Sequence, residues 1–500
     1  MLKRSFILLL ILALVSSLLV ACNGNGGKEK DTSSDTEDAE TTAPNDGYQL
    51  SVEGLDFGNK EIVIHVRGDD DCVKEIGVED DGTALSAELV ERTMATEERL
   101  NVAITVAKGE SWSNYSQTIR DLRASIQNGL GSYDIIAGWS PRLPALSAEG
   151  LFYNLNQFDY FDPEEEWWSQ SLVDALTFNG KLHLATGDIS SMYMDGALVV
   201  VFNQVLAEAR GMDYVSLYNT VEEGKWTLDY LWSVTKDVYV DQDGSDTRNE
   251  GDIFGLVAQE HLNLQFCWGS SGINIMPNNG ADRPVLDFNV ERIQAVYDKV
   301  YNLVHNNPGA VINNVDGLKL GETTMMKYFK EGNALFYIVQ LGNLAQFTDM
   351  EQDYGVLPTP KYDEEQSKYY THLHACTMFG VPLDAKDPEM SAAIMTSLAY
   401  DSNQLVIEAH FDKLLKLRYS KDSESGKMID LIYNNIYMNF DSIYNEALGT
   451  SLSDKTTMPV FAIPTLILKN DGSSVASWWQ TNKTNLQAKF NEIMDGFFDE

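Results

Sequence analysis

The sequence predicts an α/β fold of two lobes, each a sheet flanked by helices, joined by a hinge. After about residue 57, apolar strand-like runs alternate with amphipathic helical segments across short connections, a pattern typical of parallel, doubly wound sheets. Near residue 190, a polar segment separates two buried strand-like runs, as expected where a chain leaves one lobe and enters another. The 500 residues, 44% of them apolar, suffice for a core in each lobe.

The first lobe is predicted to contain three parallel strands and two helices. The strands are Lys60–Val66, residues 102–106 and residues 133–137. The helices are Ala84–Leu100 and residues 115–128, where apolar side chains recur at helical spacing.

Two loops follow the carboxyl ends of these strands, at residues 67–71 and 138–143. Sheets of this kind bind ligands beyond those ends. A tryptophan there can stack on a ligand or pack into the core, and neighbouring aspartates can bind a ligand or form a solvated acidic turn. The candidate ligand residues in the two loops are Asp69, Asp70, Trp139, Ser140 and Arg142.

The segment predicted to cross between the lobes runs from residue 178 to residue 206. Asn179-Gly180 forms a turn, because glycine adopts positive φ at little steric cost. Two apolar strands, residues 182–185 and 197–202, then enclose a polar and flexible stretch, residues 186–196. A strand pair within one domain fits the same pattern. In the crossover interpretation, the candidate residues lining the hinge are Asp188, Tyr193 and Asp195.

The run NGKLHLA followed by ALVVVFNQ resembles a block, NGK-x-Y and then L-x-Y-N-K, of the family 1 extracellular solute-binding proteins. These are the maltose-binding-protein-like, sugar-binding lipoproteins of ABC importers. The resemblance covers most of the chain after residue 57. YDIIAGW is similar to the family's P-D-I-I segment, although Tyr133 replaces the usual proline. Further similar segments are ALSAEGLFYNL at 145–155, KWTLD at 225–229, EGNALFYIVQL at 331–341 and YGVLPTP at 354–360.

The resemblance implies a two-lobed, type II periplasmic-binding-protein-like fold. It implies capture of a carbohydrate, expected to be an oligosaccharide, in an interlobe cleft and its delivery to ABC permease subunits. It also implies a monomer that is not an enzyme and needs no cofactor. Gln340 and Asn343 lie near the family's usual ligand positions, although the family's tryptophan is missing there. The implied lobes are residues 51–190 with 371–427, and residues 191–370 with 428–500.

The N-terminus resembles that of a bacterial lipoprotein. Two basic residues precede an apolar run, residues 6–20, that is too short for a comfortable membrane span. The following LVAC motif matches the lipobox, which implies removal of residues 1–21 and lipid attachment to Cys22. Residues 22–50 are acidic and nearly free of apolar side chains, so they are expected to form a disordered tether. The predicted location is the extracellular face of the cytoplasmic membrane, held by lipid alone. A secretory signal with a chance cysteine is the alternative.

The charge of the chain argues against several partners. Its 36 basic and 75 acidic side chains give a formal net charge of −39. Such a surface repels nucleic acid phosphates and anionic lipid headgroups. We therefore expect no nucleic acid partner and no membrane contact beyond the lipid.

An acidic loop partly fits a calcium site. Asp241, Asp243, Ser245 and Asp252 place oxygen ligands at loop positions 1, 3, 5 and 12. Asp246 stands where such a loop requires glycine. A structural calcium ion and a solvated acidic turn are the two interpretations.

Other aromatic and histidine residues have more than one interpretation. Trp268, before a glycine-rich turn, can stack on a sugar or pack beneath the turn, whereas Trp226 is predicted to pack. His372 and His374 share one face of a predicted strand, but a metal site needs at least one further ligand, so none is predicted there.

The sequence favours a binding protein over an enzyme. No G-x-S-x-G, phosphate-binding loop or H-E-x-x-H motif occurs, and abundant carboxylates alone do not define a glycosidase pair. Two alternatives stay open: a lipid-anchored carbohydrate-active enzyme, and a surface sensory or adhesion module on the same fold. The cysteines after the lipobox, expected to be buried thiols, are Cys72, Cys267 and Cys376.

Overall fold

The structure of the protein is a computed structural model that describes residues 50–249, 251–259, 263–277, 283–313, 322–410, 423–450 and 454–498. The predicted signal segment, Cys22 and the tether up to residue 49 lie outside the described residues. The remainder, Leu50–Glu500, is one compact unit. None of the described helices combines the length and the apolar character needed to span a bilayer.

The first sheet has four strands in the order β10-β3-β1-β2. Strands β1 (Lys60–Val66), β2 (Val102–Lys108) and β3 (Ile135–Trp139) are parallel, as predicted. Strand β10 (Thr377–Gly380) returns from much later in the chain and pairs antiparallel with β3. The sheet therefore places the loops after β1, β2 and β3 at one edge.

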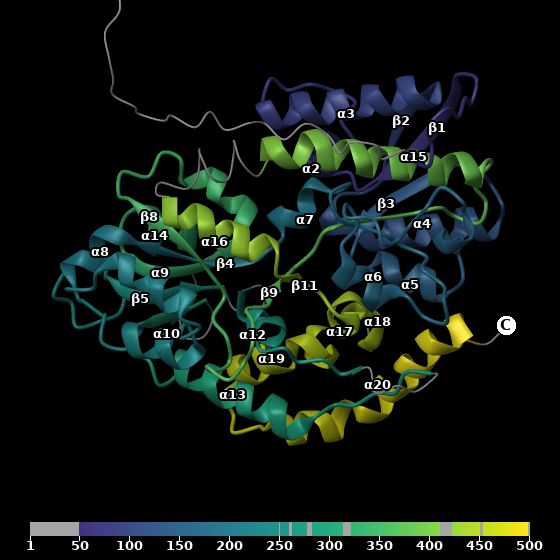
Figure 1. Ribbon diagram of the computed structural model, residues 1–500. Coiled ribbons are helices and arrows are strands. Elements are labelled where there is room, and N and C mark those ends of the chain that lie inside the picture. The colour runs from purple at the N-terminus through teal and green to yellow at the C-terminus, as the bar shows by residue number, and fades with distance from the viewer. Residues whose placement is uncertain are drawn as a thin grey trace, which may run out of the picture. The chain divides into compact units, whose positions relative to one another are not determined.

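Helices flank this sheet, and Figure 1 shows α3 and α15 running alongside each other. Thr83 caps α3 by accepting a hydrogen bond from the backbone N–H of Ser86, and Asp387 caps α15 in the same way from Met390. The helices associated with the first sheet are α2 (Asp70–Lys74), α3 (Ala84–Leu100), α4 (Tyr115–Gln127), α5 (Leu143–Ala148), α6 (Gln170–Leu176) and α15 (Pro388–Asp401).

The crossover differs from its prediction in two ways. Residues 182–185 form no strand: Ala185 makes one isolated bridge to Phe379, and the backbone N–H of Leu182 instead donates to the side chain of Asn154. The polar stretch is almost entirely buried and contains a short helix, α7 (Ser191–Asp195). Its polar groups are buried because the surrounding chain supplies hydrogen-bonding partners.

The second sheet has five strands in the order β6-β5-β7-β4-β8. The sheet is mixed. Strand β4, which directly follows the crossover segment, runs antiparallel to its neighbours β7 and β8, whereas β5 is parallel to β6 and β7. The strands are β4 (Leu198–Asn203), β5 (Phe254–Ala258), β6 (Ala310–Ile312), β7 (Ala334–Gln340) and β8 (Tyr354–Pro358).

Trp226 packs in the core behind this sheet, as predicted. It is fully buried, and its indole N–H donates to the carbonyl of Pro358 at 2.8 Å. The helices around the second sheet are α8 (Gln204–Ala209), α9 (Tyr214–Glu222), α10 (Leu228–Thr235), α12 (Phe266–Ser270), α13 (Val290–Val304), α14 (Glu322–Lys330) and α16 (Ser423–Tyr433).

Two chain connections between the sheets lie side by side. Ala197 bridges Leu373, and the backbone N–H of His374 donates to the carbonyl of Gly196. A Cβ at Gly196 would lie 1.9 Å from the carbonyl oxygen of Ala375, so this contact requires glycine.

The C-terminal region adds a two-stranded sheet, in which β9 (Thr371–His372) pairs with β11 (Ile436–Tyr437), and several helices. Helix α20 contacts α5 as well as α13 and α19 (Figure 1). The lobe boundaries given above stay a prediction. The remaining helices are α17 (Phe440–Ile443), α18 (Asn445–Leu448), α19 (Ala462–Lys469) and α20 (Val475–Phe498), with short turns at Trp112–Asn114, Leu155–Gln157, Leu341–Phe347, Ser402–Val406, Lys455–Thr457 and Pro459–Phe461.

Candidate ligand-binding site

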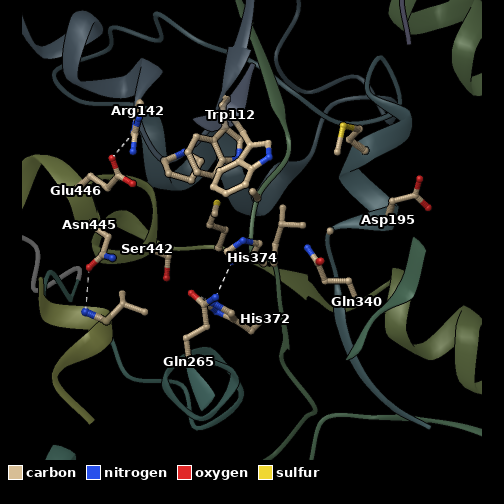
Figure 2. Close-up of a pocket in the computed structure, with 18 of the residues that line it drawn as sticks. Trp112, Arg142, Asp195, Gln265, Gln340, His372, His374, Ser442, Asn445 and Glu446 are labelled. Carbon is tan, nitrogen blue, oxygen red and sulfur yellow. Dashed lines mark hydrogen bonds and ion pairs between the residues drawn. The ribbon is translucent and has the colours of Figure 1, made fainter. Parts of the chain in front are cut away.

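A cavity of about 820 Å³ lies where the loops of the first sheet, the crossover, the end of β7 and the C-terminal turns meet. This volume is within the range of small-molecule sites. Figure 2 shows Trp112 at one end and Gln265 at the other, with Arg142 and Glu446 facing Asp195 and Gln340 across the space. The side chains used below are Arg67, Trp112, Trp139, Arg142, Asp195, Gln265, Gln340, Asn343, His374 and Glu446.

Two tryptophans form an aromatic wall. Trp112, in the turn beyond the carboxyl end of β2, is 64% exposed, which is high for a large apolar side chain. Its backbone N–H donates to Asp69 at 2.9 Å, and the same carboxylate oxygen lies 2.5 Å from Nε of Arg67. Trp139 ends β3 and is half-buried against Tyr115.

Two guanidinium groups accompany the aromatic wall. Those of Arg67 and Arg142 lie 5.5 and 5.4 Å from the ring centre of Trp139. Nε of Arg142 is 2.7 Å from the carboxylate of Glu446. Burial raises the pKa of Glu446, and the guanidinium of Arg142 opposes this shift. Both cations therefore already have carboxylate partners, which limits the net charge of this wall.

The facing wall is polar and planar. Gln340 ends β7, and Asn343 follows in the next turn. Asp195 ends α7 and lies 3.0 Å from Nε2 of His410. A Cβ at Gly342 would lie 2.8 Å from that of Asp195, so the two segments touch closely here. Amides and carboxylates of this kind are suited to hydrogen bonds with ligand hydroxyl groups.

Two histidines form the middle of the cavity. Burial lowers the pKa of His372 to about 3 and that of His374 to about 4, so both rings are neutral at pH 7. The side chain of Gln265 is within hydrogen-bonding distance of both rings (Figure 2). Among the described residues they join no cluster of metal-ligating side chains.

The cavity brings together five of the side chains chosen from sequence. They come from β3 and its loop, the crossover, and the end of β7, as the rule for strand ends and the resemblance both suggested. They are Trp139, Arg142, Asp195, Gln340 and Asn343.

Three other candidates lie near the cavity without lining it. Asp69 lies behind the wall and holds Trp112 and Arg67. Asp70 is exposed at the start of α2. Ser140 is fully buried, where its hydroxyl accepts the backbone N–H of Cys376 at 3.0 Å. Ser140 thus joins β3 to the chain before β10.

The last three candidates are buried away from the cavity. Tyr193 is hydrogen-bonded to Ser169 at 2.9 Å. Asp188 accepts hydrogen bonds from Asn403 and Tyr433, and burial raises its pKa to about 6.

Trp268 is fully buried and donates its indole N–H to the carboxylate of Asp441. Burial raises the pKa of Asp441 to about 7. Packing rather than stacking on a ligand is thus the arrangement that the structure gives Trp268. The three cysteines, Cys72, Cys267 and Cys376, are buried free thiols, as expected.

The acidic loop brings three carboxylates together. Ligand oxygens of Asp241, Asp243 and Asp252 lie within 4.8 Å of one another, and no second group of this kind occurs in the described part of the chain. Asp241 also accepts backbone N–H groups from Gly244, Ser245 and Asp246, as an ordinary acidic turn does. The two interpretations of this loop, a structural calcium ion and a solvated acidic turn, both stay predictions.

Several lining residues were not chosen from sequence. Arg67 and Asp71 lie in the first predicted loop, and Trp112 follows the carboxyl end of β2, so the same rule could have found all three. Ser442 and Glu446 come from the C-terminal helices, where no sequence pattern marks a binding residue.

No protein-family model matches the chain, and no curated protein matches it. Solved structures do. An ABC substrate-binding protein from Listeria monocytogenes in complex with cycloalternan is 14% identical, with a TM-score of 0.55 over 87% of this chain and 99% of that one. A cyclo/maltodextrin-binding protein complexed with maltotetraose is 13% identical, with a TM-score of 0.57 over 86% of this chain and 97% of that one.

A family 1 extracellular solute-binding protein from Bifidobacterium longum subsp. infantis is 15% identical, with a TM-score of 0.55 over 87% of this chain and 99% of that one. These matches span nearly the whole of each solved chain, so they establish the fold. Their sequence identity is low, so they establish the fold alone. The predicted α/β architecture is thereby confirmed: the chain has the two-lobed fold of the maltodextrin-binding and family 1 extracellular solute-binding proteins.

Proposed function

We propose that this protein binds a carbohydrate, an oligosaccharide rather than a single sugar, in the 820 Å³ cavity. The observation that carries the proposal is the pairing of an exposed indole, Trp112, with planar polar side chains such as Gln340 and Asn343 across one cavity. Pyranose rings present apolar faces to aromatic side chains and hydroxyl groups to amides and carboxylates. Two structural neighbours are described as complexes with cycloalternan and with maltotetraose, which supports the same ligand class.

The protein would act as a receptor rather than an enzyme. Closure of two lobes around a ligand is a common hinge motion, and the adjacent connections at Gly196 and Leu373 offer a place for it. We further propose lipid anchoring through Cys22 on the extracellular face of the membrane, and delivery of the bound sugar, by a monomer, to ABC permease subunits. The lipobox and the sequence resemblance support these steps.

A thermal-shift screen of the purified protein tests the ligand class. Maltose, maltotetraose, cyclic glucans and monosaccharides would be added in turn, with calcium and a chelator as separate arms. A sugar at 100 times its dissociation constant is expected to stabilise the fold by about 2.7 kcal/mol, which a melting curve resolves. Chromatography of the incubated sugar should show it intact. No shift with any sugar would contradict the proposal, and cleavage products would favour the enzyme alternative.

Replacing Trp112 by alanine is expected to weaken sugar binding at least tenfold, about 1.4 kcal/mol. The indole is the most exposed large aromatic surface in the cavity, and truncation removes it without disturbing a core. Isothermal calorimetry with the sugar found in the screen measures the effect. Trp232→Ala is the matched control, because Trp232 lies on α10 outside the cavity. Unchanged affinity in Trp112→Ala would remove this indole from the site.

A further inference from the structure

Gln265 connects the two cavity histidines. It precedes α12 and is 4% exposed. Its side-chain nitrogen lies 2.6 Å from Nδ1 of His374, and its side-chain oxygen lies 3.4 Å from Nε2 of His372. Figure 2 shows His372 beside Gln265 at the end of the cavity opposite Trp112, and His374 between them and Trp112.

Because the side-chain amide of Gln265 contacts both histidine rings, the position of the proton on one ring determines its position on the other. Both histidines are neutral, so each carries one ring N–H. An amide donates through its nitrogen and accepts through its oxygen. If the amide nitrogen of Gln265 donates to Nδ1 of His374, the proton of His374 must be on Nε2. The amide oxygen of Gln265 then accepts the Nε2–H of His372.

The surroundings of His372 favour this orientation of the amide. Nδ1 of His372 is buried and has no hydrogen-bond partner. The reversed amide would place a proton on that nitrogen and create a buried, unpaired N–H. Buried N–H groups without an acceptor are rarer in folded proteins than under-used acceptors. The observed orientation leaves only a lone pair unsatisfied.

The other nitrogen of His374 is available to a ligand. His374 is half-buried and lines the cavity, and its Nε2 bonds to no group that the structure describes. We propose that Gln265 is a positioning residue that holds His374 as an Nε2–H donor aimed at a ligand oxygen. This inference rests on the proposed sugar-binding function. It assigns His374 to recognition of an acceptor oxygen, such as a hydroxyl, ring or glycosidic oxygen.

Nuclear magnetic resonance of the purified protein, labelled with ¹⁵N at its seven histidines and free of ligand, tests the tautomer directly. His374→Gln and His372→Gln variants assign the two rings. We expect His374 to show a protonated Nε2 and an unprotonated Nδ1. The reverse pattern would overturn the inference. This experiment involves no sugar, so its result is independent of the proposed function.

A Gln265→Glu variant tests the consequence for binding. A carboxylate only accepts, so it draws the proton of His374 to Nδ1 and leaves a lone pair facing the cavity. It also raises the pKa of His374, against the opposing charges of Lys455 and Arg67 that already act on this ring, and it lies beside neutral His372. Calorimetry with maltotetraose at pH 8 should show affinity reduced about tenfold.

The pH dependence separates positioning from simple damage. As the pH falls below the raised pKa of His374 in Gln265→Glu, the imidazolium regains its Nε2–H, so affinity should recover, whereas wild-type affinity stays flat. A loss that is the same at every pH, with an unchanged tautomer, would contradict the positioning role. If maltotetraose does not bind the wild-type protein, it is not a ligand of the proposed receptor. The tautomer measurement alone then decides whether the inference about Gln265 holds.

Discussion

Replacing Trp268 by alanine is expected to lower the free energy of unfolding by about 3–5 kcal/mol. The indole is fully buried, so truncation leaves a cavity among its neighbours. It also removes a hydrogen-bond donor from the buried carboxylate of Asp441. Urea denaturation followed by circular dichroism at pH 7 measures the loss.

The matched control for this prediction is Trp112→Ala. Because Trp112 is 64% exposed, its removal should change the free energy of unfolding by no more than about 0.5 kcal/mol. The two tryptophans should thus behave in opposite ways, one affecting stability and the other affinity. A Trp268→Ala protein with wild-type stability and no sugar binding would show that Trp268 reaches the ligand after all.

Asp441→Asn is expected to stabilise the protein relative to wild type by an amount that grows with pH. Burial raises the pKa of Asp441 from 3.8 to about 7 in the folded state. Between these values the folded protein holds a proton that the unfolded chain has lost, so raising the pH favours unfolding. From pH 5 to pH 7 this effect is about 2 kcal/mol, and asparagine, which does not ionise, abolishes it. Denaturation of both proteins at pH 5, 6, 7 and 8 measures the difference.

The difference between the two proteins isolates Asp441 from other titrating groups. The pKa values of His65, His372 and His374 are lowered by burial, so the stability they affect changes with pH in the opposite direction. They are present in both proteins, and their effects cancel. Asp188, with its pKa raised to about 6, also cancels. A constant offset between the curves at all pH values would contradict the prediction.

Local patterns predicted the first sheet well. Strand β1 is buried on both faces from Ile64 to Val66, as is typical of a strand in a parallel sheet, and its bounds match the prediction. The same patterns were wrong for residues 182–185, where apolar side chains are buried but the backbone pairs at only one point. Burial of apolar side chains can be predicted from the local sequence, whereas strand pairing depends on whether another strand lies beside the segment in the folded protein.

Candidate site residues were predicted where a strand end or a family segment marked a position. Trp139 and Arg142 follow β3, and Gln340 ends β7. The prediction did not distinguish Trp268 from these, because a tryptophan in a loop has the same local appearance whether it faces a cavity or a core. Its partner, Asp441, is 173 positions away in the chain.

The sequence by itself determined the alternating elements, the strand ends that carry ligand-binding loops, and the acidic surface, because these follow from local periodicity and composition. Only the tertiary structure decided which polar groups are buried. Asp188, Tyr193 and Ser140 have partners that come from distant segments, and a buried polar group is stable only where such a partner exists. The histidine pair and the glutamine between them became visible for the same reason, since Gln265 is more than 100 positions before either ring.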